Sequence, residues 1–144
     1  NQIRKLLEEG NIERVNHLLG RRFSIEGVVS HGEKIGRKLG VKTANINLEE
    51  EYMHLKRGVY ACYVTLNGKT LKGVCNVGVN PSINVLTKPR LEVHILDFSD
   101  DIYGEVIVVH FIKRLRDELF FKHVEDLIHQ IQRDIDVVEK LGDI

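Results

Sequence analysis

The dipeptide Asn67-Gly68 stands between two apolar runs, and this arrangement constrains the fold more than any other feature of the sequence. Asn-Gly favours the two-residue turn of a β-hairpin, because both residues tolerate positive φ. The run before it, Gly58 to Leu66, is rich in Val and Tyr, which favour strands. The returning run is Thr70 to Val77. The sequence therefore predicts two antiparallel strands joined at residues 67–68.

Further strands are predicted on both sides of this hairpin. Apolar residues alternate or cluster over Phe23–Val29, Leu91–Phe98 and Glu105–Ile112. Ser99-Asp100-Asp101 predicts a turn between the last two, closing at Tyr103-Gly104. Because no helical pattern separates these strands, the chain is expected to form an antiparallel barrel or sandwich.

Helical periodicity is found at the two ends of the chain. The first residues predict two short helices that end at Gly10 and Gly20, typical of a lid on the core or a connector to another domain. An apolar stripe from Phe120 to Val138 predicts a long helix, with Asp117 and Glu118 at its positive end. We expect this helix to pack against the barrel.

Charge and length limit the classes of function. The chain of 144 residues has 21 basic and 21 acidic side chains, which argues against a surface that binds nucleic acid or membrane as a whole. No apolar run approaches the roughly 20 residues of a membrane span, and the first residues lack a signal-peptide core. Cys62 and Cys75 have no metal-type spacing. They indicate a reducing compartment, so a cytoplasmic location is expected, although one disulfide stays open.

A glycine-rich basic segment is the most unusual part of the sequence. Between His31 and Lys42, a single acid, Glu33, accompanies four basic residues, namely Lys34, Arg37, Lys38 and Lys42. Glycines let backbone N–H groups approach an anion, and basic side chains bind phosphate. The segment therefore favours a polyphosphate ligand, although it contains neither a Walker A nor a Gly-x-Gly-x-x-Gly motif. A solvated lysine-bearing loop is the alternative.

Thr43 and Asn45 follow this segment and are two positions apart. In an extended chain both side chains point to the same face. Their hydroxyl and amide oxygens could complete the shell of a Mg²⁺ whose charge is balanced mostly by phosphate. The alternative is local hydrogen bonding at a turn or strand edge.

Glu92 is a carboxylate within a predicted strand, on the same face as His94 and Leu96. Glu is a poor strand former, so it is expected either in water or in a lined pocket. In a pocket it could act as a general base.

Taken together, these segments resemble the riboflavin kinase family over nearly the whole chain. The segments that recur in the family's order are Leu19–Phe23, Gly27–Val29, Gly36–Asn45, Gly58–Ala61, Asn76–Pro81, Leu91–Phe98, Tyr103-Gly104 and Arg114–Arg116. The resemblance implies a mainly β fold, a six-stranded antiparallel Greek-key barrel with a C-terminal α-helix and short N-terminal helices. It also implies that residues 1–20 are a helical connector from a missing N-terminal domain and that residues 21–144 are the riboflavin kinase domain.

The resemblance implies ATP-dependent phosphorylation of the riboflavin 5′-hydroxyl to give FMN and ADP, within FMN and FAD biosynthesis. Mg²⁺ with ATP is the implied cofactor. The implied partners are riboflavin/FMN, ATP/ADP and an adenylyltransferase domain in the parent chain, with no nucleic acid and no membrane. One alternative is a catalytically impaired flavin- or nucleotide-binding module on the same barrel. Another, a nucleic-acid-binding barrel, is disfavoured by the neutral charge and by the absence of Trp.

The family pattern also implies roles for individual residues. Glu92 would be the catalytic base, and Thr43 and Asn45 would bind Mg²⁺. The implied nucleotide-binding residues are Gly32, Arg37, Lys38, Gly40, Thr43, Asn45, His94 and Tyr103. The implied flavin-binding residues are Arg116, Glu118 and Phe121. The sequence departs from the pattern at Lys42, where the family has proline, and lysine leaves the segment before Thr43 less constrained.

Overall fold

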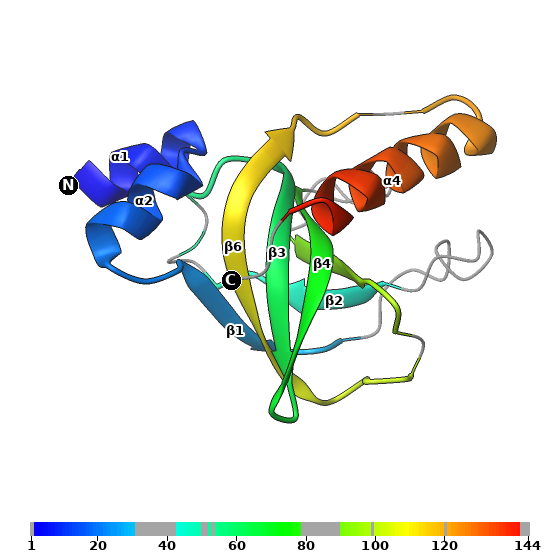
Figure 1. The fold of residues 1–144 in the computed structure, drawn as a ribbon, viewed down its shortest axis with the longest axis horizontal. Helices are drawn as coiled ribbons and strands as arrows, with labels where there is room; N and C mark the ends of the chain where they lie inside the picture. The colour runs from blue at the N-terminus through cyan, green and yellow to red at the C-terminus, as the bar shows by residue number, and fades with distance from the viewer. Residues whose placement is uncertain are drawn as a thin grey trace.

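A six-stranded antiparallel sheet forms the centre of the molecule (Figure 1). The computed structural model describes residues 2–30, 43–49, 52, 54–78, 90–98, 100–119 and 121–141. The strands are β1 (Ser24–Val28), β2 (Ala44–Asn47), β3 (Gly58–Leu66), β4 (Lys69–Gly78), β5 (Arg90–Ile95) and β6 (Val106–Arg116). The helices are α1 (Gln2–Glu9), α2 (Ile12–Leu19) and α4 (Val124–Glu139).

The strand order β1-β6-β3-β4-β5-β2 is that of a Greek key, since β3, β4 and β5 are consecutive neighbours and β6 returns beside β3. The sheet nearly closes on itself, because Ser30 N donates to Asn45 O at 2.8 Å and bridges the two outermost strands. Gly27 of β1 faces Ile46 of β2 so closely that an added Cβ would collide with the isoleucine side chain. The predicted fold class, a six-stranded antiparallel barrel, is confirmed.

The predicted hairpin is present between β3 and β4. Leu66 pairs with Lys69, and both turn residues have positive φ, 49° at Asn67 and 80° at Gly68. The neighbouring strands differ from prediction at their ends. Strand β5 stops at Ile95, before a turn in which Asp97 has a φ of 56°, whereas β6 continues to residue 116.

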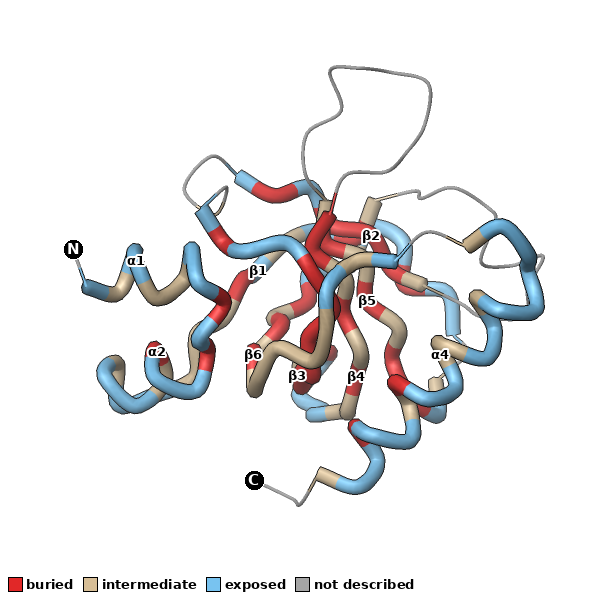
Figure 2. Tube along the Cα trace, turned by 90° about the horizontal axis from the view of Figure 1, so that it is seen from above, coloured by how far each residue is buried: buried red, intermediate tan, exposed pale blue. Residues whose placement is uncertain are grey.

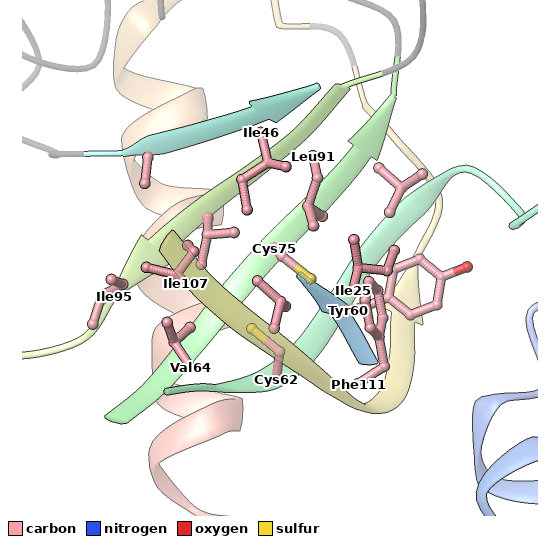
Figure 3. Packing of buried hydrophobic residues seen from close by; sticks show 14 of the residues in the cluster. Ile25, Ile46, Tyr60, Cys62, Val64, Cys75, Leu91, Ile95, Ile107 and Phe111 are labelled. Carbon is pink, nitrogen blue, oxygen red and sulfur yellow. The ribbon is translucent and has the colours of Figure 1, made fainter. Parts of the chain in front are cut away.

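Apolar side chains that alternate along the strands fill the barrel (Figure 3). The rings of Tyr60 and Phe111 meet edge to face with centroids 5.2 Å apart, a geometry that their charge distribution favours. Cys62 and Cys75 are buried in this core as free thiols, which answers the question of a disulfide. Burial, followed by the hydrogen bond with Cys62, raises the pKa of the Cys75 thiol well above its usual range.

Helices α1 and α2 lie beside β1 and β6 (Figure 1) and end in left-handed glycines, Gly10 and Gly20, as predicted. Within α2, Ile12 and Val15 are 1% and 0% exposed. The side chain of Asn16 joins α2 to the sheet, because its Nδ2 donates to Phe111 O at 2.8 Å and its Oδ1 accepts from Phe23 N at 2.7 Å. The helices therefore pack as part of the barrel domain; their role as a connector stays a prediction.

Helix α4 lies over the outer face of the sheet (Figures 1 and 2). It buries Val138 together with Ala61 and Leu96, which confirms the predicted packing against the barrel. Its predicted beginning was wrong, since the helix starts at Val124 and not near Asp117 and Glu118. The physical reason is that β6 extends farther than expected and Arg114 Nη2 donates to Asp117 Oδ1 at 2.5 Å, which holds this acid in the connection.

Candidate active site

Glu92 lies in β5 between two asparagines from the neighbouring strands. In the antiparallel register, Asn45 of β2 stands opposite Glu92 on one side, and Asn76 of β4 stands opposite it on the other. Directly paired residues point to the same face with Cβ atoms about 4.5–5.5 Å apart. Asn45, Glu92 and Asn76 therefore form one polar row, on the sheet face opposite the barrel core.

Two amide oxygens of this row lack hydrogen-bond partners. Within the described part of the chain, Asn45 Oδ1 and Asn76 Oδ1 are buried and accept no hydrogen bond. Asn45 is only 2% exposed. Leaving a buried acceptor unpaired costs about 1–3 kcal/mol, and such groups are rare in folded proteins. Each oxygen is therefore a candidate position for a bound cation or hydrogen-bond donor.

Thr43 lies just before β2 and is half-buried, two positions from Asn45. The unpaired Oδ1 of Asn45 fits the predicted role as a Mg²⁺ ligand, because hard oxygen atoms are the ligands this ion prefers. Among the residues described, no group of three or more His, Cys, Asp or Glu side chains could hold a metal ion. A divalent cation at Thr43 and Asn45 would complete its shell with oxygens from water and from a phosphate ligand.

Glu118 reaches the same region from the connection after β6. An added Cβ on Gly78 would collide with the Glu118 carboxylate, so this acid lies directly against the β4 backbone. Gly78 and Asn76 are two positions apart and belong to the same face of β4. Burial raises the pKa of Glu118, and the nearby Arg57 guanidinium opposes that shift.

The structure pairs Arg116 with α4. Its Nε and Nη2 atoms donate to the two carboxylate oxygens of Asp134 at 3.0 and 2.7 Å, and Gln130 Nε2 donates to Asp134 Oδ1 at 3.1 Å. Arg116 Nη1 also donates to Asp117 O at 3.0 Å. Arg116 thus anchors the start of the connection that carries Glu118 and leads to the half-buried Phe121. A flavin contact by Arg116 stays a prediction.

The remaining predicted residues are more dispersed. His94 is half-buried on β5, on the same face as Glu92 and opposite Val74. Tyr103 is 55% exposed in the turn before β6, where its N–H donates to Asp101 Oδ1 at 3.1 Å. The predicted nucleotide residues in the basic segment lie outside the described residues; they are Gly32, Arg37, Lys38 and Gly40.

Sequence reasoning missed Asn76 and Gly78 as members of the site. Both belong to a segment that carried the family resemblance, yet neither was given a role. The available signal was the polar Asn76 between two apolar residues, Cys75 and Val77, which point to the core. Only the pairing of β4 with β5 shows that Asn76 stands beside Glu92.

Comparison with curated proteins gives relatives of one kind, named bifunctional riboflavin kinase/FMN adenylyltransferase. The protein from Buchnera aphidicola subsp. Schizaphis graminum is 46% identical over 140 residues, which cover 96% of this chain and 45% of the relative. The Bacillus subtilis protein is 39% identical over 134 residues, with coverage of 92% and 42%. The chain spans about half the length of the curated relatives it matches.

Solved structures share the fold. Riboflavin kinase from Trypanosoma brucei superimposes with a TM-score of 0.62 at 21% identity, over 81% of this chain and 74% of the other. A structure described as a macrolide-efflux protein from Streptococcus pneumoniae gives a TM-score of 0.89 at 32% identity, over 98% of this chain and 46% of that one. None of the helices described here has the length and apolarity to cross a membrane. The family model of riboflavin kinase (Flavokinase) matches residues 19–141, and the chain therefore belongs to the riboflavin kinase family.

Proposed function

We propose that this chain transfers the γ-phosphoryl group of ATP to the 5′-hydroxyl of riboflavin, giving FMN and ADP. The observation that carries the proposal is the polar row, in which Glu92 stands between two asparagines whose buried Oδ1 atoms accept no hydrogen bond within the described part of the chain. Membership of the riboflavin kinase family and the names of the curated relatives support it.

In the proposed reaction, Glu92 is the base. Its carboxylate accepts the proton of the 5′-hydroxyl while the hydroxyl oxygen bonds to the γ-phosphorus and the bond from that phosphorus to the β-phosphate oxygen breaks. Phosphoryl transfer needs little covalent chemistry from a protein, so positioning and charge neutralisation dominate. A base in the middle of an ordered strand meets this need, because its backbone is fixed by neighbours on both sides.

Thr43 and Asn45 would hold the Mg²⁺, which when bound neutralises charge on the phosphates. The nucleotide would further contact Gly32, Arg37, Lys38 and Gly40 of the basic segment, together with His94 and Tyr103. This assignment places the phosphate donor on the β2 side of Glu92.

The flavin would lie on the opposite side of Glu92, near β4. Arg116, Glu118 and Phe121 are proposed to contact it from the connection between β6 and α4. Two contacts fix that connection, the pair between Arg116 and Asp134 and the packing of Glu118 on Gly78. We also propose that the parent chain carries an adenylyltransferase domain, as the names of the relatives indicate.

The experiment is a kinase assay of this chain with riboflavin, ATP and Mg²⁺, in which FMN is separated from riboflavin by chromatography. Wild-type protein should form FMN, and Glu92→Gln should lose most of that activity. Glu26→Gln is the matched control, because Glu26 is an exposed carboxylate on β1. Binding of flavin or ATP without formation of FMN would overturn the proposal in favour of a non-catalytic binding module. Lys42, which stands where the family has proline, would then be the candidate cause of the lost activity.

A further inference from the structure

Asn76 holds a place in the polar row that the proposed reaction leaves unused. It stands opposite Glu92 on β4, and its Oδ1 is buried with no hydrogen-bond partner in the described part of the chain. Replacing such a group by an apolar one of similar shape would relieve a cost of about 1–3 kcal/mol in the ligand-free protein. A sequence that keeps this oxygen therefore has a use for it.

The chemistry of Asn76 Oδ1 limits the groups that can be its hydrogen-bond partner. An amide oxygen only accepts hydrogen bonds, so Asn76 Oδ1 needs a donor, either a hydroxyl or an N–H group. A water molecule can supply this donor in the free protein, and a ligand hydroxyl or N–H group that displaces the water can supply it in the complex.

The position of Asn76 in the row indicates which ligand can reach its oxygen. The row runs Asn45, Glu92, Asn76 across β2, β5 and β4, so Glu92 separates the two unpaired oxygens. Asn45 lies on the side assigned to metal and phosphate. Asn76 lies on the other side, where Gly78 is the next residue on the same face and Glu118 packs against it.

We propose that Asn76 is a substrate-positioning residue, whose Oδ1 accepts a hydrogen bond from a hydroxyl of the polyol chain of the phosphate acceptor. A polyol carries hydroxyls on successive carbons, and Glu92 and Asn76 present two acceptors side by side on adjacent strands. One hydroxyl meets Glu92 for transfer, and a neighbouring one meets Asn76 and fixes the chain. This inference rests on the proposed function, which supplies the acceptor.

The test compares Asn76→Leu with a matched control, Asn47→Leu. Asn47 is an exposed asparagine on β2, one same-face position beyond Asn45 and paired with Arg90. The substrates are riboflavin and three analogues that each lack one ribityl hydroxyl, at C2′, C3′ or C4′. We expect wild type and Asn47→Leu to prefer riboflavin over one analogue by about 10-fold in kcat/KM.

Asn76→Leu should lose that preference, because its KM for riboflavin rises to the value for the analogue. Its KM for ATP should stay unchanged, and the melting temperature of the ligand-free protein should stay the same or rise. Asn76→Asp keeps an acceptor oxygen in place, so it should retain the preference even where charge repulsion with Glu92 lowers kcat.

A purely structural asparagine gives a different pattern. A lower melting temperature together with losses for ATP, riboflavin and all analogues alike would overturn the proposal, as would an undiminished preference in Asn76→Leu. Quenching of flavin fluorescence measures binding of the same analogues without turnover. A wild-type protein that forms no FMN would thus refute the proposed function, while the binding preference would still decide the role of Asn76.

Discussion

Replacing Asp134 by alanine removes the partner that ties β6 to α4. Asp134 and Arg116 form a bidentate ion pair, in which their side chains are 7% and 20% exposed, respectively. Loss of one member of a buried pair costs about 3–5 kcal/mol. Arg116 keeps partial access to water and its hydrogen bond to Asp117 O, so we expect the lower value, about 3 kcal/mol. For a chain of this length that corresponds to a fall in melting temperature of roughly 10 °C.

The measurement is thermal and urea unfolding followed by circular dichroism. Asp136→Ala is the matched control, since Asp136 lies on the same helix and also accepts from a glutamine four residues earlier, but is exposed. It should cost less than about 0.5 kcal/mol. Because Arg116 anchors the connection that carries Glu118, Asp134→Ala should also raise the KM for riboflavin more than that for ATP. Equal stabilities of the two variants would refute the reasoning.

Three further predictions concern single residues. Glu92→Gln should lower kcat by about 100- to 10,000-fold while the Kd for ATP, measured by calorimetry, stays near its wild-type value. Thr43→Val should weaken ATP binding with Mg²⁺ present and not without it, and equal losses in both titrations would contradict the metal role. Burial, and then Arg22, lower the pKa of His110 below its ordinary value of 6.5. The unfolded chain therefore binds the proton first as the pH falls, so the free energy of unfolding should decrease below about pH 6.5. His110→Gln should flatten this dependence, and an unchanged slope would contradict the assignment.

Features that depend on a few neighbouring residues could be predicted from the sequence. The turn at residues 67–68 and the helix ends at Gly10 and Gly20 all require positive φ, which these residue types tolerate best. The alternation around Glu92 also placed it on the face opposite Leu91 and Val93, as the structure confirms.

Features that depend on distant residues could not be predicted. The register between β4 and β5 brings Asn76 beside Glu92, and no local pattern encodes that pairing. The start of α4 was misplaced for a similar reason. Asp117 has the chemistry of an acid at a helix N-terminus, but the guanidinium of Arg114 binds it in the connection instead.

The side-chain amide of Asn16 makes the two hydrogen bonds that a backbone peptide group of a neighbouring strand would make. Phe111 N donates to Phe23 O at 2.8 Å, and the Asn16 amide then supplies the next rung, donating to Phe111 O and accepting from Phe23 N. The ladder between the start of β1 and β6 is thus completed by a residue of α2. We expect the amide hydrogen of Phe23 to exchange with solvent only when α2 and the barrel open together.

This coupling has a mechanical consequence for any domain that precedes α1. Helix α2 is held by buried side chains and by the two hydrogen bonds of Asn16, so we expect it to move together with the barrel. A preceding domain would therefore be joined to the barrel through a rigid helical connection and not through a flexible linker. Its orientation relative to the polar row would be set at the junction with α1, and Asn16→Ala would loosen the attachment of α2 to the barrel without changing any residue of the polar row.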